Sequence, residues 1–533
     1  MISRLLVFDN ADEPELLVDW LPHNPRGKAL LTSRAAVFDA VGIVQPIALD
    51  VLNEDEAVTL LVQRTGRDER TGAAALNQEL DGLPLALEQA GAYIKQQHIG
   101  FESYLKLYER LGLTQLEKAK ANTGNYPSTV LKTWKLNFEA VAETSPAAAK
   151  LLQLSAFFAP DDIPYWIVIA GVKHLGDTLA EQLEQEDYEL ASVAMAELLA
   201  PLNQYSLVRW DAERYCYSVH RLVQTVIRDE LSSETQSVWL KQVTNLLNEV
   251  LPDVEKFETL PIYYAQVLPH GLSVIALNYT VGDLSEALAV LSTKIASHLC
   301  QQGKYEQAEP IFVNTFTLTK HLYGDEHAGV ETSLNNLGMV YLHQGKYEQA
   351  EPIFVNALTL TKHLYGDEDA GVAGSLNNLA GLYEEQEQYS KAKPLLLEAL
   401  KIYQGCFGNL DSHVANILNN LARIYEEQGE YKEAQKYYEN AFSIWQVLLG
   451  NKNPYVGLSL NNLAMVHEKQ GQYEEAEFCL TQSLLIWKKI FSDDHPYLAL
   501  NYQNLATVYE KQERYCLFAW LRQNDVHFGT PHI

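Results

Sequence analysis

The sequence lacks the residue clusters that mark several classes of protein. Its five cysteines are scattered along 533 residues and form no C-x-x-C pair, so we expect neither a disulfide framework nor a zinc site. Basic residues are scarce, with 40 lysines and arginines against 69 aspartates and glutamates, and the net charge is −29. This balance argues against nucleic acid or an anionic membrane as partner and favours basic or neutral peptides.

Long apolar stretches are also missing. The longest apolar run, Ile163–Val172, is too short to cross a bilayer, and the first residues do not have the pattern of a signal peptide. No Ser/His/Asp, Cys/His or metal-spaced cluster emerges, so a hydrolase acting on small substrates has no support. The sequence therefore predicts a soluble, cytoplasmic protein of several domains.

What the sequence has instead is a repeat of 42 residues over Ala287–Tyr515. Tyrosines recur at this spacing, as Tyr305, Tyr347, Tyr389, Tyr431, Tyr473 and Tyr515. Leu-Asn-Asn-Leu opens a helix pattern at Leu334, Leu376, Leu418 and Leu460, and a second helix pattern follows each short turn. Because neither helix can bury its apolar stripe alone, the repeats must stack into a solenoid.

The residues of the repeat resemble a known family. Leu-Asn-Asn-Leu-Ala, Gly-Lys-Tyr-Glu-Gln-Ala-Glu-Pro and a length above the usual 34 residues are similar to the tetratricopeptide repeats (TPR) of kinesin light chains and their bacterial and fungal relatives. About five repeats match. The first, near Leu284–Glu326, has Thr293-Lys294 in place of Asn-Asn, as expected of a capping repeat. The resemblance implies that a protein or peptide binds the concave face.

Paired asparagines recur on the first helix of each repeat, away from its packing stripe. A helical wheel turns them toward the inner side of the superhelix, where carboxamides can bind the backbone of an extended peptide. The alternative is that they hydrogen-bond between helices and fix the stacking. The predicted peptide-binding residues are Asn335, Asn336, Asn377, Asn378, Asn419, Asn420, Asn461, Asn462 and Asn504.

The amino-terminal segment has the pattern of two strands of a parallel sheet. Leu5–Phe8 ends at Asp9 and Ala29–Thr32 ends near Arg34, so an acid and an arginine can project from neighbouring strand ends toward one phosphate group. Together with Gly82-Leu83-Pro84-Leu85-Ala86-Leu87, in this order, the motifs resemble the NB-ARC nucleotide-binding module of STAND-class signalling ATPases.

The resemblance implies a site for ADP or ATP with Mg²⁺. Asp9 would hold Mg²⁺ through water, Arg34 would sense the γ-phosphate, and Pro84 would line the adenine side. His220 stands where the family has a histidine that touches the β-phosphate of ADP and holds the closed state. The alternatives are a strand-end acid bound by a helix N-terminus, a surface arginine, a helix-starting proline and a histidine with structural hydrogen bonds.

Two departures from the family pattern bear on nucleotide chemistry. Asn10 stands where many members have a second acid, which leaves Asp12 as the only candidate catalytic residue. No G-x-x-x-x-G-K-[ST] loop occurs, so we expect weak nucleotide binding or none. We also expect that the first half of the nucleotide domain is missing, either upstream of a misplaced start or truly lost. The family is a slow ATPase switch, and we assign no enzymatic activity to this chain.

The predicted fold is mainly α, with a partial α/β P-loop NTPase remnant, a helical domain, a winged helix and an α-solenoid of TPR helix pairs. The expected segments are 1–50 (end of the NB-ARC nucleotide-binding domain), 51–125 (helical, ARC1-like), 126–232 (winged-helix-like), 233–283 (helical linker), 284–515 (TPR) and 516–533 (divergent tail). Strands at Leu207–Trp210 and Tyr215–Val219 would form the wing, and the acidic residues around it favour packing over DNA binding.

Two functions agree with this organisation. The first is a signal-transducing protein in which a TPR sensor is coupled to an ADP/ATP switch, with homo-oligomerisation when the switch opens. The second is a constitutive TPR scaffold without nucleotide binding. Both predict a protein partner on the repeats.

Overall fold

The computed structural model describes residues 4–8, 27–31, 51–80, 82–115, 128–251, 261–282, 284–450, 453–491 and 495–513. The chain divides into two compact units, each built from several segments. Unit 1 is 1–152, 196–210 and 219–229, and unit 2 is 153–195, 211–218 and 230–533. The domain boundaries expected from the sequence stay predictions.

The two strands expected at the start of the chain are present. β1 (Arg4–Phe8) and β2 (Gly27–Leu31) pair in parallel, in a register that sets Arg4 against Gly27 and Phe8 against Leu31. The apolar runs therefore form the parallel pair that the sequence predicts. Asp9, Asp12 and Arg34, which were expected to follow these strands, lie outside the described residues.

A helical bundle follows in unit 1. Its helices are α1 (Glu54–Thr65), α2 (Arg70–Leu80), α3 (Pro84–Gln96), α4 (Phe101–Gln115) and α5 (Ser128–Thr144). Asn53 and Glu56 form a reciprocal capping box that starts α1, as the acid-rich sequence there indicates. Leu61, Leu87 and Phe101 are fully buried in the core between these helices.

The segment that the sequence predicts to be a winged helix contains helices and short strands. Its elements are α6 (Pro146–Ser155), β3 (Ile163–Pro164), α7 (Tyr165–Ala170), η3 (Val172–His174), α8 (Asp177–Leu183), α9 (Tyr188–Gln204), β4 (Arg209–Asp211), β5 (Cys216–Ser218) and α10 (Arg221–Glu230). The strands form a sheet of order β3-β5-β4, in which β3 and β5 are antiparallel. Asp211 Oδ1 accepts from the backbone N–H groups of Glu213 and Arg214, which closes the predicted turn of the wing.

The helices α11 (Ser233–Val250) and α12 (Pro261–Val281) pack against the first repeat. Lys294 Nζ donates to the backbone oxygens of Asn248 (3.0 Å) and Leu251 (2.7 Å), at the C-terminal end of α11. A cation there is favourable because the free carbonyls of a helix end carry negative charge. This explains why Lys294 stands where later repeats have asparagine.

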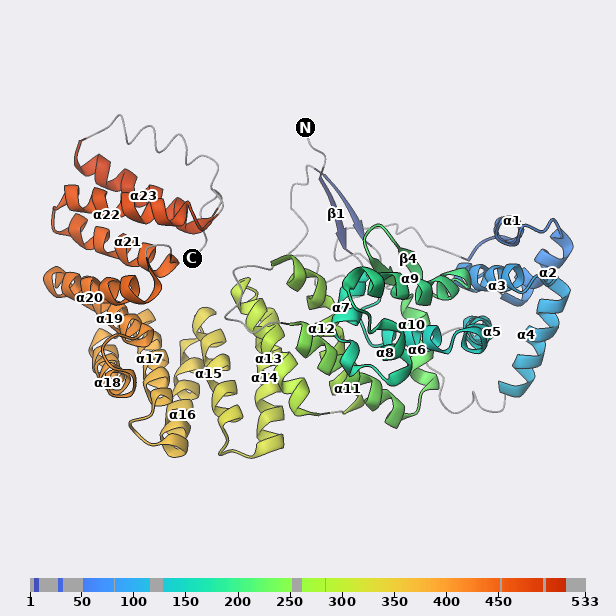
Figure 1. The fold of residues 1–533 in the computed structure, drawn as a ribbon, viewed down its shortest axis with the longest axis horizontal. Helices are drawn as coiled ribbons and strands as arrows, with labels where there is room; N and C mark the ends of the chain where they lie inside the picture. The colour runs from blue at the N-terminus through green and yellow to red at the C-terminus, as the bar shows by residue number, and fades with distance from the viewer. Residues whose placement is uncertain are drawn as a thin grey trace. The chain divides into compact units, whose positions relative to one another are not determined.

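The repeats form eleven further helices in the described part of the chain. The first helices of the pairs are α13 (Glu286–Gln301), α15 (Ala328–His343), α17 (Ala370–Glu385), α19 (Ser412–Glu427), α21 (Pro454–Lys469) and α23 (Pro496–Lys511). The second helices are α14 (Tyr305–Tyr323), α16 (Tyr347–Tyr365), α18 (Tyr389–Phe407), α20 (Tyr431–Leu449) and α22 (Tyr473–Trp487). They follow one another along a curved, open stack (Figure 1), which confirms the predicted solenoid.

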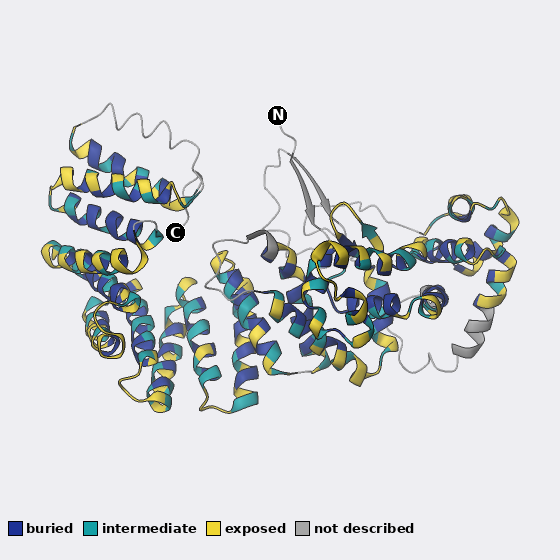
Figure 2. Ribbon diagram, in the orientation of Figure 1, coloured by how far each residue is buried: buried dark blue, intermediate teal, exposed yellow. Residues whose placement is uncertain are grey.

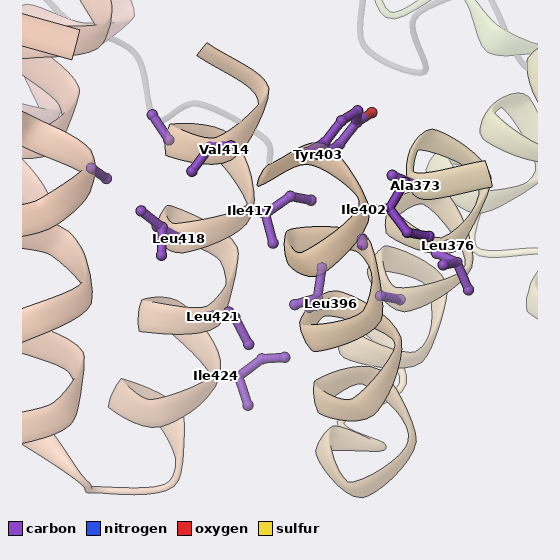
Figure 3. Close-up of a cluster of buried hydrophobic side chains, with 14 of the residues drawn as sticks. Ala373, Leu376, Leu396, Ile402, Tyr403, Val414, Ile417, Leu418, Leu421 and Ile424 are labelled. Atoms are coloured by element: carbon purple, nitrogen blue, oxygen red, sulfur yellow. The ribbon is translucent and has the colours of Figure 1, made fainter. Parts of the chain in front are cut away.

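The core of the solenoid is continuous from one repeat to the next. Leu376 of α17, Leu396 of α18, and Ile417 and Leu421 of α19 are buried in one apolar cluster (Figure 3). Buried residues lie on the helix sides that face a neighbouring helix, and exposed residues lie on the opposite sides (Figure 2). Each repeat therefore depends on its neighbours for burial.

Within the described ranges, no helix combines the length and the apolar character needed to cross a bilayer.

Candidate peptide-binding surface

The predicted asparagines hydrogen-bond to one another from one repeat to the next. In each bond, Nδ2 of the second asparagine of a pair donates to Oδ1 of the first asparagine in the preceding repeat. The bonds are Asn378 to Asn335 (3.3 Å), Asn420 to Asn377 (2.9 Å), Asn462 to Asn419 (3.0 Å) and Asn504 to Asn461 (3.1 Å). We call these residues the asparagine ladder. Its bonds are the interhelical contacts of the stacking interpretation, and peptide binding by the same residues stays a prediction.

From α17 onward, the ladder uses only one of the two hydrogen-bonding groups of each carboxamide. Asn377 Nδ2 and Asn378 Oδ1 have no partner among the described residues. Asn461 is only 4 % exposed, and its Nδ2 also lacks a partner there. Asn335 differs because its Nδ2 donates to Glu331. From α17 onward, the ladder thus offers free donors and free acceptors, the two groups that an extended peptide backbone requires.

The ladder lies on the inner wall of the solenoid. Among the described residues, three pairs of first helices approach one another directly, α13 with α15, α15 with α17, and α21 with α23, and no pair of second helices approaches as closely as these. A stack whose first helices are closer together than its second helices curves toward the first helices. We therefore expect the free carboxamide groups to face the concave side, and their role in peptide binding stays a prediction.

Two buried carboxylates tie neighbouring repeats together beside the ladder. Glu384 of α17 pairs with Arg423 of α19, and Glu468 of α21 pairs with Lys511 of α23. The side chain of Glu384 is 8 % exposed and that of Glu468 is 2 % exposed. Burial raises the pKa of Glu384, and Arg423 opposes this shift by favouring the charged form. Each of these charges is neutralised within the chain.

Glu426 of α19 has no such cation. Its Oε2 accepts from Tyr438 Oη at 3.0 Å, and no ion pair to Glu426 is found in the described part of the chain. Burial raises the pKa of Glu426, while Arg423 and Lys469 act on it only as more distant charges. The sequence analysis missed these three acids, although they recur with the 42-residue period of the repeat.

The nucleotide-binding predictions are only partly covered by the described residues. Pro84 is exposed at the first position of α3, where a proline is favourable because its fixed φ suits a helix start. His220 is exposed before α10, and its Nδ1 accepts from Leu222 N at 3.2 Å. Both positions agree with the structural alternatives. Contact with ADP or ATP stays a prediction.

One loop in unit 1 is held by three helices of the bundle, and the sequence analysis missed it. Ser206 Oγ lies 2.8 Å from Arg64 Nη2 of α1 and donates to Glu88 Oε1 of α3 at 2.9 Å. The fully buried Asn137 of α5 donates through Nδ2 to the backbone oxygen of Tyr205 at 2.9 Å. These residues have no common spacing in the sequence, so no periodic signal joins them.

Among the residues that the structure describes, no three histidine, cysteine, aspartate or glutamate side chains come together as a metal site would require.

The comparisons with known proteins agree with this architecture. A tetratricopeptide repeat family model matches residues 286–354, 329–405, 413–484 and 457–515, and a domain of unknown function, DUF7779, matches residues 139–236. A nucleotide-binding leucine-rich repeat (NLR)-like protein of Hyaloscypha variabilis is 28% identical over 368 residues, which are 62% of this chain and 34% of that protein. The chain therefore spans about a third of the length of this curated relative.

Two solved structures are also similar. One is a STAND protein with a tetratricopeptide repeat sensor from Pyrococcus horikoshii, at 15% identity and a TM-score of 0.42, covering 98% of this chain and 80% of that chain. The other contains the nearly identical, kinesin-light-chain TPR-like repeats from Podosopora anserina, at 22% identity and a TM-score of 0.34, covering 37% of this chain and 92% of that chain.

Residues 286–405 and 413–515 thus form a tetratricopeptide-repeat solenoid. The repeat match and the similarity to an NLR-like protein support the NB-ARC-like plus TPR architecture that the sequence predicts.

Proposed function

We propose that the chain is a regulatory, protein-binding scaffold whose solenoid holds an extended peptide segment of another protein along the asparagine ladder. The observation that carries this proposal is the set of free carboxamide groups on the inner wall. Asn377 and Asn419, which are half-buried, each keep an N–H₂ donor, and their neighbours keep an acceptor oxygen. These groups can bind peptide C=O and N–H groups without requiring one side-chain sequence.

The ladder allows stacking and peptide binding to be tested separately. Asn377→Asp keeps the Oδ1 acceptor that Asn420 uses, but it removes the free donor. Asn378→Asp removes the donor that reaches Asn335, but it keeps a free acceptor. Both variants add one negative charge at adjacent positions of the same face, so a comparison of the two cancels the effect of charge.

The experiment uses peptides selected from a random 12-residue display library on the immobilised full chain. We expect Asn377→Asp to raise the Kd of a selected peptide about tenfold with little change in stability. We expect Asn378→Asp to lower the free energy of unfolding by about 1 kcal/mol. Failure to enrich any peptide, or equal affinity of wild type and Asn377→Asp, would contradict the proposal.

We further propose that the solenoid is coupled to an ADP- or ATP-responsive NB-ARC switch in the intact protein. The support is the similarity to an NLR-like protein and the parallel strands at the start of the chain. The second candidate, a constitutive scaffold, is supported by the absence of a G-x-x-x-x-G-K-[ST] loop from the 533 residues. Calorimetric titration of the full chain with ATP and Mg²⁺ separates the two, because micromolar binding favours the switch and no heat of binding favours the scaffold.

A further inference from the structure

We propose that the peptide held by the solenoid is basic, and that Glu426 binds one of its lysine or arginine side chains. This proposal rests on the proposed function, because it names the chemistry of the partner for the same surface. The occupant is thus an extended, positively charged segment of another protein.

The carboxylates beside the ladder share its face of the solenoid. Glu384, Glu426 and Glu468 each follow the first asparagine of their repeat by seven residues. Seven residues are close to two turns of an α-helix, so these side chains lie on the same side of the helix as the ladder, about 10 Å away along the axis. An extended peptide covers about 3.3 Å per residue, so about three of its residues reach from the ladder to a carboxylate.

One carboxylate of the row, Glu426, makes no ion pair within the described residues. Arg423, which neutralises Glu384, follows it by 39 residues, and the residue 39 after Glu426 is Met465. Lys511, which neutralises Glu468, follows it by 43 residues, and the residue 43 after Glu426 is Lys469. Lys469 is exposed and makes no ion pair with Glu426 within the described residues. Glu426 is thus the one carboxylate of the row that makes no ion pair among the described residues, although Lys469 and Arg423 act on it as more distant charges.

The surroundings of Glu426 suit a long basic side chain. Only Tyr438 donates a hydrogen bond to the carboxylate, which leaves acceptor capacity for an ammonium or guanidinium group. Methionine at 465 is flexible and apolar, and residues of this kind pack against the aliphatic part of lysine or arginine. Glu385 and Glu427 are exposed at the C-terminal ends of α17 and α19, and the net charge of −29 attracts a cationic partner from a distance.

The test uses the same random 12-residue display library on the full chain, with wild type, Glu426→Gln and Glu439→Gln. Glutamine at 426 keeps an oxygen for Tyr438 and removes only the charge, so the repeat packing stays intact. Glu439→Gln is the matched control, because Glu439 is an exposed glutamate on the second helix α20.

We expect the selected peptides to be enriched in lysine or arginine, and Glu426→Gln to raise their Kd about tenfold while Glu439→Gln leaves it unchanged. Peptides enriched in acidic or apolar residues, or an unchanged Kd for Glu426→Gln, would overturn this inference and leave the proposed function in place. Failure to enrich any peptide would overturn the proposed function, and the basic partner with it.

Discussion

The helical bundle of unit 1 and the repeats of unit 2 hold their polar contacts in different ways. In the repeats, the ladder and the ion pairs recur with the period of the sequence, so one contact such as Asn420 to Asn377 indicates the others. In the bundle, Arg64, Glu88 and Ser206 meet once, over sequence separations of 24 and 118 residues. The comparison teaches that a periodic lattice can lose one contact and keep its pattern, whereas a single buried network cannot.

The largest expected effect is on the network of the bundle. Asn137 is fully buried, and its Nδ2 donates to the backbone oxygens of Gln89 and Tyr205. Asn137→Ala removes both hydrogen bonds and leaves a gap in the core, so we expect the free energy of unfolding to fall by about 3 kcal/mol, measured by urea denaturation. The same substitution at the exposed Asn203 should change it by less than about 0.5 kcal/mol. Equal effects at the two positions would remove the contrast between the regions.

A pH effect of similar size is expected before the first repeat. His270 of α12 is 1 % exposed, and burial lowers its pKa from 6.5 to about 4. The unfolded chain therefore binds a proton at a pH where the folded chain does not, so this contribution to stability is complete above pH 6.5 and is lost as the pH falls toward 4. Between pH 7 and pH 4 the loss is about 3 kcal/mol.

Urea denaturation at a series of pH values checks this prediction. His270→Phe should lose most of this pH dependence, and the control His321→Gln, at an exposed position, should keep it. A pH profile of His270→Phe that follows wild type would show that other groups are responsible.

Two glycines within the repeats differ in the space around them. A Cβ on Gly338 would lie 2.6 Å from the ring of Phe354, whereas a Cβ on Gly381 would meet nothing within 4 Å. We expect Gly338→Ala to lower the free energy of unfolding by about 2 kcal/mol and Gly381→Ala to raise it by about 0.7 kcal/mol. Calorimetric melting of the two variants measures both. If both substitutions shift the free energy of unfolding in the same direction, the close approach of α15 and α16 does not require glycine at position 338.

The sequence was sufficient for the architecture of the repeats because one period contains the apolar stripe, the turn and the asparagines together. It also indicated the strand pair at β1 and β2 and the start of α3 at Pro84. It could not show that one carboxamide group of each asparagine would bond to the neighbouring repeat while the other stays free. This depends on how the side chains are oriented across the stack. It also could not join Asn137 to Tyr205, because only the packing of the bundle brings them together.

The central claim is that the inner wall of the solenoid binds an extended peptide through the ladder. A crystal structure of the full chain with a selected peptide tests it most directly. The account predicts peptide carbonyl oxygens within hydrogen-bonding distance of Nδ2 of Asn377 and Asn419. A peptide bound instead along the second helices, over the exposed Val355 and Leu397, would contradict it.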